Sequence, residues 1–217
     1  MMPSSNMTFV LTSCGRPQLL KETLDSFKIH NEYPIDRFIV VEDQVEKSPE
    51  VVSLIAERYP FIELILTDGH VGQMAAIDQA YATVKTDYIF HCEDDWQFLH
   101  NGFITRSIRV LEANADVLQV HLRRKSDLNG HPVEKIPDIA GEPLHRLAYG
   151  FRNVWNGFSF NPGVKRLSDY HRIGGSYKAL GHEPQTSEKY RELGYYAVVF
   201  SDETFVRHIG GGHHIPF

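Results

Sequence analysis

The first half of the chain alternates short apolar runs with longer stretches in which apolar residues recur every three or four positions. The apolar runs are residues 8–13, 38–41, 61–66 and 88–92. Their length and their β-branched and aromatic content are typical of buried strands. The stretches between them open at Pro17, Ser48 and Gly72 and have the spacing of amphipathic helices. This alternation predicts an α/β fold in which helices cover both faces of a mostly parallel sheet.

Polar residues follow these apolar runs, where the predicted strands would end. They are Ser13, Asp43, His70 and the acids Glu93, Asp94 and Asp95. Ligands of parallel α/β sheets bind beyond the carboxyl ends of the strands. We therefore expect four separate turns to bring these side chains to one crevice.

Glu93, Asp94 and Asp95 carry the strongest chemical signal, because three consecutive carboxylates follow a buried strand. Adjacent carboxylates repel one another and lose hydration on burial unless a cation neutralises them. Hard oxygen ligands of this kind suit Mg²⁺ or Mn²⁺. The alternative is a solvated acidic turn, which needs no ligand.

The second half of the chain is less regular. Asn101 can cap a helix that runs through Glu112, and residues 117–122 predict a further strand. Residues 123–149 are rich in proline, glycine and charge, which predicts a long functional loop or an irregular insertion. The later segments are a strand at 158–160 that ends in Asn161-Pro162-Gly163, a short helix at 188–193, a strand at 195–200 and a glycine-rich basic tail at 207–214.

Composition and charge narrow the range of functions. A chain of 217 residues builds one substantial core, so we expect a single domain. A net charge of −6, with ordinary hydrophobic content, gives no reason to expect a nucleic-acid partner. No apolar run approaches the roughly 20 residues that cross a bilayer, and the first residues lack the features of a signal peptide. We therefore expect a cytoplasmic protein in which Cys14 and Cys92 are free thiols.

Four pieces of the sequence occur in an order that resembles a known enzyme family. They are Thr12-Ser13-Cys14-Gly15-Arg16-Pro17 with its following helix, Asp43 after the second strand, the helix at 72–82 that leads to Glu93-Asp94-Asp95, and His208-Ile209-Gly210. In this order they resemble a nucleotide-sugar glycosyltransferase of the GT-A fold, most similar to family 2. The resemblance covers nearly the whole chain.

The resemblance implies one GT-A domain over residues 1–217, a Rossmann-like sheet with flanking helices. Residues 1–99 would bind the nucleotide-sugar donor, and residues 100–217 would form the acceptor half and a C-terminal flap. Thr12 and Asp43 would contact the base or ribose, and Asp95, assisted by Glu93, would bind the Mn²⁺ or Mg²⁺ that holds the diphosphate. Other residues expected at the donor are Ser13, Arg16, His70, Gln73 and Asp94.

Two later residues complete the expected site. Glu183, in Gly181-His182-Glu183-Pro184, stands where the family usually places its catalytic base, and the alternative is a capping or surface glutamate. His208 is expected to be a metal ligand beside Asp95 or to bind the diphosphate, and the alternative is a structural histidine. His213 and His214 would belong to the flap.

The chain departs from the family pattern at two positions. Glu93 replaces the usual aspartate, so its contact with the metal is expected to be indirect, and Gln73 replaces a basic residue that often follows the helix start. The compensating positive charge for the phosphates would then come from His70, from Arg123-Arg124 or from the tail. Trp96 and Trp155 are candidates to stack on sugar rings, with burial in the core as the alternative.

The sequence therefore predicts a metal-dependent, inverting glycosyltransferase. It would move a sugar from a nucleoside-diphosphate donor, with UDP as the first expectation, to a carbohydrate or to a lipid-linked acceptor reached by peripheral membrane contact. One alternative is a sugar nucleotidyltransferase, although residues 12–17 lack the glycine- and lysine-rich phosphate loop of that class. The other alternative is a non-catalytic protein of the same fold that binds nucleotide sugars or glycans.

Overall fold

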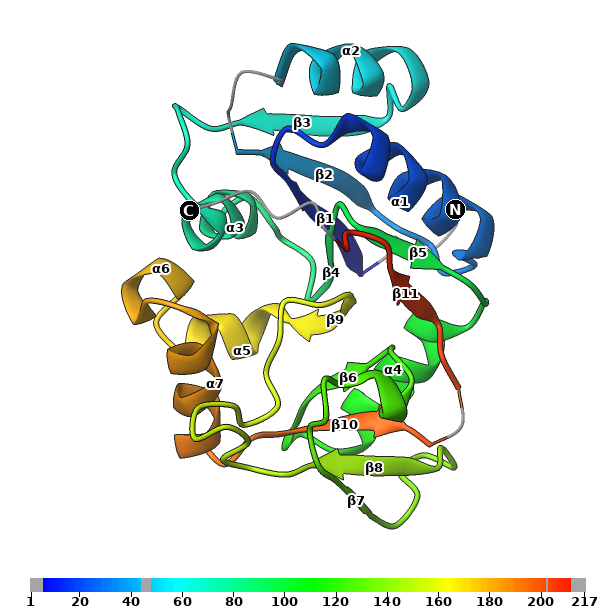
Figure 1. Ribbon diagram of the computed structural model, residues 1–217, viewed down its shortest axis with the longest axis vertical. Coiled ribbons are helices and arrows are strands. Elements are labelled where there is room, and N and C mark those ends of the chain that lie inside the picture. The colour runs from blue at the N-terminus through cyan, green and yellow to red at the C-terminus, as the bar shows by residue number, and fades with distance from the viewer. Residues whose placement is uncertain (1–5, 44–47, 202, 212–217) are drawn as a thin grey trace.

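Figure 1 shows a computed structural model, which describes residues 6–43, 48–201 and 203–211. The four apolar runs form strands β1 (Met7–Ser13), β2 (Arg37–Glu42), β3 (Ile62–Leu66) and β4 (Tyr88–Glu93). The helices between them are α1 (Pro17–His30), α2 (Ser48–Arg58) and α3 (Gln73–Tyr81). The strands are parallel in the order β3-β2-β1-β4, and β9 (Gly163–Arg166) joins the edge of β4 in the antiparallel direction. The predicted α/β class with a mostly parallel sheet is confirmed.

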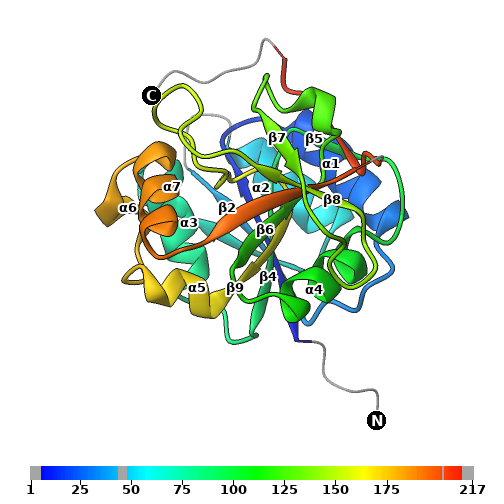
Figure 2. The same ribbon diagram turned by 90° about the horizontal axis from the view of Figure 1, so that it is seen from below.

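Helices cover both faces of this sheet, and that is why its strands are apolar along their whole length. Successive residues of β1 serve different cores: Phe9 packs with Phe27 of α1, at 4.4 Å between ring centroids, whereas Val10 belongs to the cluster that includes Ile77 of α3. The later helices are α4 (Phe103–Ala113), α5 (Leu167–Arg172), α6 (Tyr177–Leu180) and α7 (Glu183–Glu192). Figure 2 shows α3, α5, α6 and α7 on one side of the strands and α1 and α4 on the other.

A second sheet contains the late strands, which the sequence did not separate from the first. Its strands are β6 (Val117–His121), β10 (Tyr196–Phe200), β8 (Leu144–Leu147) and β7 (Val133–Lys135), in the order β6-β10-β8-β7. The prediction of an irregular loop at residues 123–149 was wrong, because this segment holds β7, β8 and a turn of 3-10 helix, η1 (Lys125–Asp127). Strands of three or four residues carry too little periodicity to be recognised, and β8 depends on its distant partner β10.

One strand, one helix start and one helix cap also differ from the prediction. Residues 158–160 are not a strand, because their backbone N–H groups donate to the side chains of Ser187, Gln119 and Glu183 rather than to a neighbouring strand. Helix α7 begins at Glu183 rather than at 188, since His182 forms a capping box with Gln185 and Pro184 suits the first turn. Asn101 does not cap α4: Gly102 holds the cap position.

A short ribbon brings the end of the described chain back to the acidic cluster. Strand β5 (Trp96–Phe98) pairs in the antiparallel direction with β11 (Val206–His208), and His208 lies opposite Trp96. The backbone N–H of Ile209 donates to the carbonyl oxygen of Asp95, at 2.9 Å. This ribbon places a C-terminal histidine beside a carboxylate that precedes it by more than a hundred residues. His213 and His214 lie outside the described residues.

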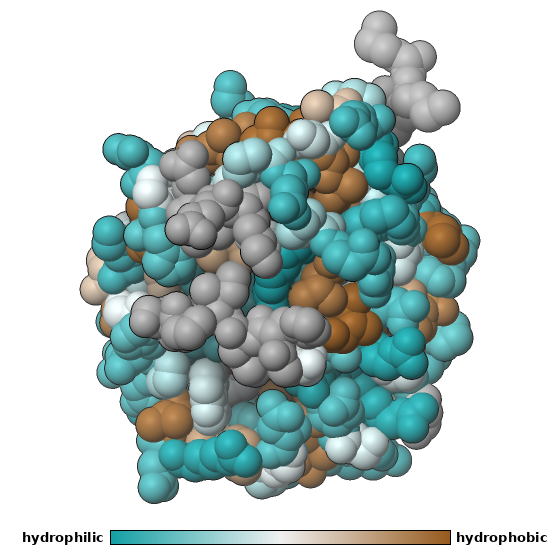
Figure 3. Space-filling view, turned by 45° about the horizontal axis from the view of Figure 1, so that its top comes forward, coloured by the Kyte–Doolittle hydropathy of each residue, from teal (hydrophilic) through white to brown (hydrophobic). Residues whose placement is uncertain are grey.

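The surface carries no element suited to crossing a bilayer: none of the helices in the described ranges is long and apolar enough. On the face in Figure 3, hydrophilic side chains predominate and the apolar ones form separate patches. Both cysteines are free, as expected.

Candidate active site

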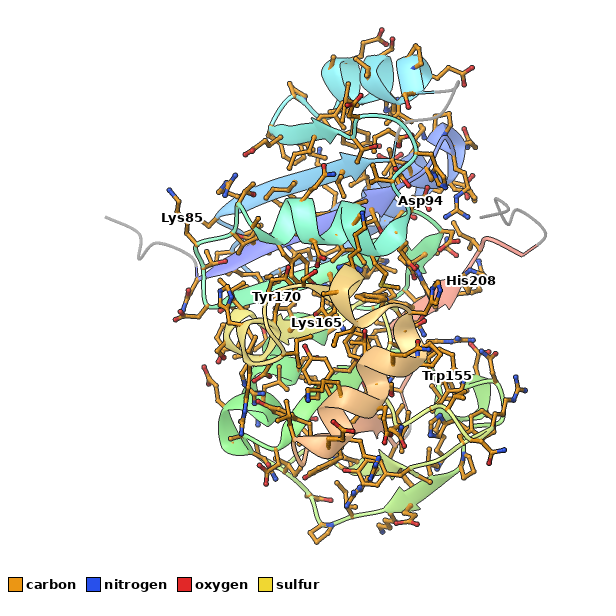
Figure 4. All side chains as sticks on the ribbon, turned by 90° about the vertical axis from the view of Figure 1, so that its left-hand side faces the viewer. Lys85, Asp94, Trp155, Lys165, Tyr170 and His208 are labelled. Carbon is orange, nitrogen blue, oxygen red and sulfur yellow. The ribbon has the colours of Figure 1, made fainter. Side chains whose placement is uncertain are left out.

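One cavity of about 700 Å³ collects the polar side chains at the carboxyl ends of the parallel strands. It is lined by all ten residues predicted for the donor and the metal: Thr12, Ser13, Arg16, Asp43, His70, Gln73, Glu93, Asp94, Asp95 and His208. In Figure 4, Asp94 and His208 lie on the side toward which the strands run, and Lys85 lies on the opposite side. The expected convergence of separate turns on one crevice is therefore present.

Arg16 provides the main positive charge inside this cavity. Its guanidinium donates to both oxygens of Asp94, with Nε 3.1 Å from Oδ2, and Nη1 donates to Asp95 Oδ2 at 2.9 Å. Asp94 is fully buried and also accepts the backbone N–H of Cys14 at 3.4 Å. Asp94 therefore fixes the turn between β1 and α1, while Thr12 and Ser13, both largely buried, line the cavity at the end of β1.

Asp43 organises the loop that precedes α3. Its carboxylate accepts the backbone N–H groups of Val71 (2.8 Å) and Gly72 (2.9 Å) and the hydroxyl of Thr67 (3.0 Å). His70 Nδ1 lies 2.9 Å from Asp43 Oδ2, and its half-exposed ring forms part of the cavity wall. The two residues are held next to one another by this loop.

Glu93 is bound by protein groups at both oxygens. Gln73 Nε2 donates to Oε1 at 2.7 Å, and Trp96 Nε1 donates to Oε2 at 3.3 Å. Burial, with the charges of Asp95, Glu183 and Asp94, raises the pKa of Glu93 from 4.5 to about 8. Burial also raises the pKa of Asp94, to about 6, although Arg16 opposes the shift. The cluster thus carries more negative potential than Arg16 balances.

The two carboxylate oxygens of Asp95 differ in their contacts. Its Oδ2 contacts Arg16 and His208 Nε2, the latter at 3.3 Å. Its Oδ1 is buried and has no hydrogen-bond partner among the described residues. A carboxylate oxygen, a nearby imidazole and excess negative charge fit a divalent cation.

Cys14, Asp43 and His70 form a second group with metal-ligand atoms, all within 4.8 Å of one another. Both oxygens of Asp43 already accept hydrogen bonds from the loop. Burial and the nearby acids raise the pKa of the Cys14 thiol to about 11, which disfavours the thiolate that a metal requires. The chemistry of this second group therefore fits a cation less well than the surroundings of Asp95 do.

Glu183 lies outside the donor cavity, in the wall between two neighbouring cavities of about 350 and 260 Å³. Its Oε1 accepts the backbone N–H of Phe160 at 2.8 Å, and the Ser159 hydroxyl also donates to its carboxylate. Burial raises the pKa of this carboxyl group. It is neither a surface residue nor the cap of α7, whose cap is His182.

The wall between the donor cavity and the smaller neighbour includes two asparagines that the sequence did not single out. Asn129 and Asn161 line both the donor cavity and the smaller neighbour, as does Arg123. Trp155 lines both cavities at Glu183 and is not part of the core, whereas Trp96 is buried. The asparagines stand in turns before Gly130 and in Asn161-Pro162-Gly163, and turn chemistry alone does not separate a functional asparagine from a structural one.

The model of one protein family, Glycosyl transferase family 2, matches residues 8–168. The match covers most of the chain and every part of the donor cavity except His208. The chain belongs to glycosyltransferase family 2. This membership removes the nucleotidyltransferase alternative. No curated protein sequence matches the chain.

Solved structures share the GT-A fold. A mannosyltransferase from Pyrobaculum calidifontis, PcManGT, in complex with GDP-Man and Mn²⁺, has a TM-score of 0.68 at 17% identity, covering 94% of this chain and 57% of that one. GalNAc-T7 with UDP, GalNAc and Mn²⁺ has a TM-score of 0.68 at 9% identity, with coverages of 96% and 44%. TarS from S. aureus has a TM-score of 0.64 at 11% identity, with coverages of 92% and 36%. The chain thus spans between about a third and somewhat over half of these proteins.

Gly210 permits the close approach of the tail to Asp95, and its substitution tests whether the tail sets the position of that residue. A Cβ atom at position 210 would lie 2.8 Å from Asp95 Cβ and 2.9 Å from Cγ, so Gly210→Ala must displace the carboxylate. We expect a loss of about 1–3 kcal/mol in the free energy of unfolding, as for other overpacked sites, and weaker Mn²⁺ binding by calorimetry.

Gly211→Ala is the matched control, because a Cβ atom there meets no atom of the described residues within 4 Å. It should leave both quantities unchanged. Equal Mn²⁺ affinity in the two variants would show that the tail does not set the position of Asp95.

Proposed function

We propose that this domain is a metal-dependent, inverting glycosyltransferase that moves a sugar from a nucleoside-diphosphate donor, UDP in the first instance, to a hydroxyl group of a carbohydrate or lipid-linked acceptor. One observation carries the proposal. Ten polar residues from both ends of the chain line a single cavity, and a buried carboxylate, Glu183, stands in the wall of the adjoining ones. A glycosyltransferase needs a site for the donor diphosphate next to a base for the acceptor hydroxyl.

The donor would occupy the larger cavity with its diphosphate near Asp95. Asp95 and His208 would hold Mn²⁺ or Mg²⁺. Glu93, whose oxygens are bound by Gln73 and Trp96, would act on the metal indirectly, because a bound cation favours its ionised form. The bound metal supplies charge stabilisation to the departing diphosphate. Thr12 and Asp43, which line the same cavity, would contact the nucleoside.

Arg16 is suited to a second role at the diphosphate. In the absence of donor its guanidinium neutralises Asp94 and Asp95. A bound cation would compete for Asp95, and Nη1 would then be available for a phosphate oxygen while Nε remains on Asp94. This would supply the positive charge that Gln73 does not.

Glu183 would act as the base on the acceptor side. Its carboxylate takes the proton of the acceptor hydroxyl while that oxygen forms a bond to the anomeric carbon. The bond from the anomeric carbon to the diphosphate breaks, and the diphosphate leaves with its electron pair. Attack from the face opposite the leaving group inverts the configuration. Trp155 and Phe151, in the wall of the neighbouring cavity, offer aromatic surfaces for the acceptor ring.

Asp95→Asn tests the metal assignment. In the wild type, UDP or GDP at about a hundred times its dissociation constant should stabilise the protein by roughly 2.7 kcal/mol when Mn²⁺ is present, and much less in excess chelator. The variant should lose this metal-dependent increment and roughly 10²-fold or more of its turnover, because the cation is no longer held.

Asp87→Asn is the control, because it makes the same change at the opposite, exposed end of β4. It should behave as the wild type does. A stabilisation by nucleotide that is identical with Mn²⁺ and with chelator, in wild type and Asp95→Asn alike, would contradict the metal assignment.

Glu183→Gln tests the base. The amide keeps the volume of the side chain but cannot take a proton, so sugar transfer should fall by roughly 10² to 10⁴ while the nucleotide dissociation constant stays the same. Glu192→Gln, on the exposed surface of the same helix, should retain transfer within twofold. Transfer by Glu183→Gln at nearly the wild-type rate would contradict the role of Glu183 and move the base elsewhere. A wild-type protein that binds nucleotide but transfers no sugar would instead favour the non-catalytic alternative.

A further inference from the structure

A buried lysine lies beneath the acceptor side of the site and has no part in the chemistry described above. Lys165 of β9 is only 6% exposed, and Figure 4 shows it inside the molecule, between the strands and the later helices. Among the described residues, no carboxylate lies within 4.0 Å of its ammonium group. Burial lowers the pKa of Lys165 from 10.5 to about 7. An apolar side chain would fill this position at a lower cost in stability.

The ammonium group binds the main chain of residue 159. Lys165 Nζ donates to the carbonyl oxygen of Ser159 at 2.8 Å and to Gln119 Oε1 at 3.1 Å. The same Gln119 oxygen accepts the backbone N–H of Ser159 at 3.2 Å. The lysine and the glutamine therefore fix the N–H and the carbonyl group of one residue.

The fixed segment is the one that holds Glu183. Phe160 donates its backbone N–H to Glu183 Oε1 at 2.8 Å, and the Ser159 hydroxyl donates to the same carboxylate. The backbone N–H of Asn161 in turn donates to Ser159 Oγ at 3.1 Å, which orients that hydroxyl. Lys165 is thus connected to Glu183 through a single residue, although the two side chains form no ion pair.

We propose that Lys165 is a positioning residue for the catalytic base: its ammonium group fixes Ser159, and through it the two hydrogen bonds that hold the Glu183 carboxylate, while its charge favours the ionised carboxylate. The inference rests on the proposed role of Glu183 as the base. Lys165 lines none of the three cavities at the site. The reaction needs an ionised, oriented carboxylate in a site where burial favours the neutral acid, and the buried positive charge of Lys165 opposes this effect.

Other titratable groups surround this lysine. Those of the surrounding elements are His91 and Glu93 on β4, His121 on β6, Asp169 on α5, Tyr177 on α6 and Glu183 on α7. Burial keeps both histidines neutral by lowering each pKa, and it raises the pKa of Tyr177. Asp169 is paired with Arg166 at 2.9 Å. Of the carboxylates, Glu183 and Glu93 are the two whose charges raise the pKa of Lys165.

The experiment compares Lys165→Arg, Lys165→Gln and Lys165→Met. Turnover is measured as nucleoside diphosphate released from UDP-glucose or GDP-mannose, whichever stabilises the protein more. An opposite charge lowers the pKa of a carboxyl group, so its removal in the Gln and Met variants should move the acid limb of the kcat profile upward by roughly one pH unit. The nucleotide dissociation constant should not change, and Lys165→Arg should keep the wild-type profile.

Lys189→Met, on the surface of α7, is the matched control and should leave the profile in place. Combining Lys165→Met with Glu183→Gln should cost no more turnover than Glu183→Gln alone, because both changes act on one carboxylate. An unshifted acid limb in folded Gln and Met variants would overturn the inference. Turnover that survives Glu183→Gln would instead refute the base assignment, so the two failures are distinguishable.

A second measurement leaves Lys165 unchanged. Lysines labelled with ¹³C at Cε can be titrated by NMR in the wild type and in Glu183→Gln, with the Lys165 signal assigned from any folded Lys165 variant or by triple-resonance methods. Since the charge of Glu183 favours the ammonium form, the midpoint for Lys165 should fall in Glu183→Gln. The same midpoint in both proteins would show that the two groups are not coupled and would overturn the inference.

Discussion

The balance of charge at the end of β4 is the constraint on which the site depends. Three carboxylates stand at the end of one buried strand. They are contacted by Arg16 from the first turn, Gln73 from α3 and His208 from the last described strand. The guanidinium engages Asp94 and Asp95 but leaves one oxygen of Asp95 without a partner among the described residues. The carboxylates are thus only partly neutralised by protein groups, and the remaining negative charge suits a cation that carries a diphosphate.

The site divides into two electrostatic regions with different tasks. The donor cavity concentrates acids that attract a metal, and their burial raises the pKa of Glu93 and Asp94. On the acceptor side one carboxylate, Glu183, receives hydrogen bonds from Ser159 and Phe160, with the charge of Lys165 behind it. In the proposed mechanism the carboxylates of the donor cavity bind a cation, and Glu183 takes a proton.

Much of this arrangement was predictable from the sequence, and the reasons are specific. The inner strands β1 and β4 are largely buried, and all four parallel strands appear in the sequence as apolar runs. The rule that ligands bind at strand ends then selects Ser13, Asp43, His70 and the acids. Strands β6 and β10 of the second sheet correspond to the strands predicted at 117–122 and 195–200. Strands β7 and β8 were not predictable, because they have three and four residues and β8 pairs with the distant β10. Lys165 was missed for a related reason. A lysine in a short edge strand looks solvated until tertiary structure covers it.

The central claim is that Asp95, with His208 beside it, holds a divalent cation at the diphosphate. The most direct measurement is the anomalous diffraction of crystals grown with Mn²⁺ and UDP or GDP. The account predicts a single Mn²⁺ peak in coordination contact with Asp95 and the diphosphate, with Arg16 moved from Asp95 toward a phosphate oxygen. A peak between Cys14, Asp43 and His70, or an ordered diphosphate with no Mn²⁺ at Asp95, would contradict it.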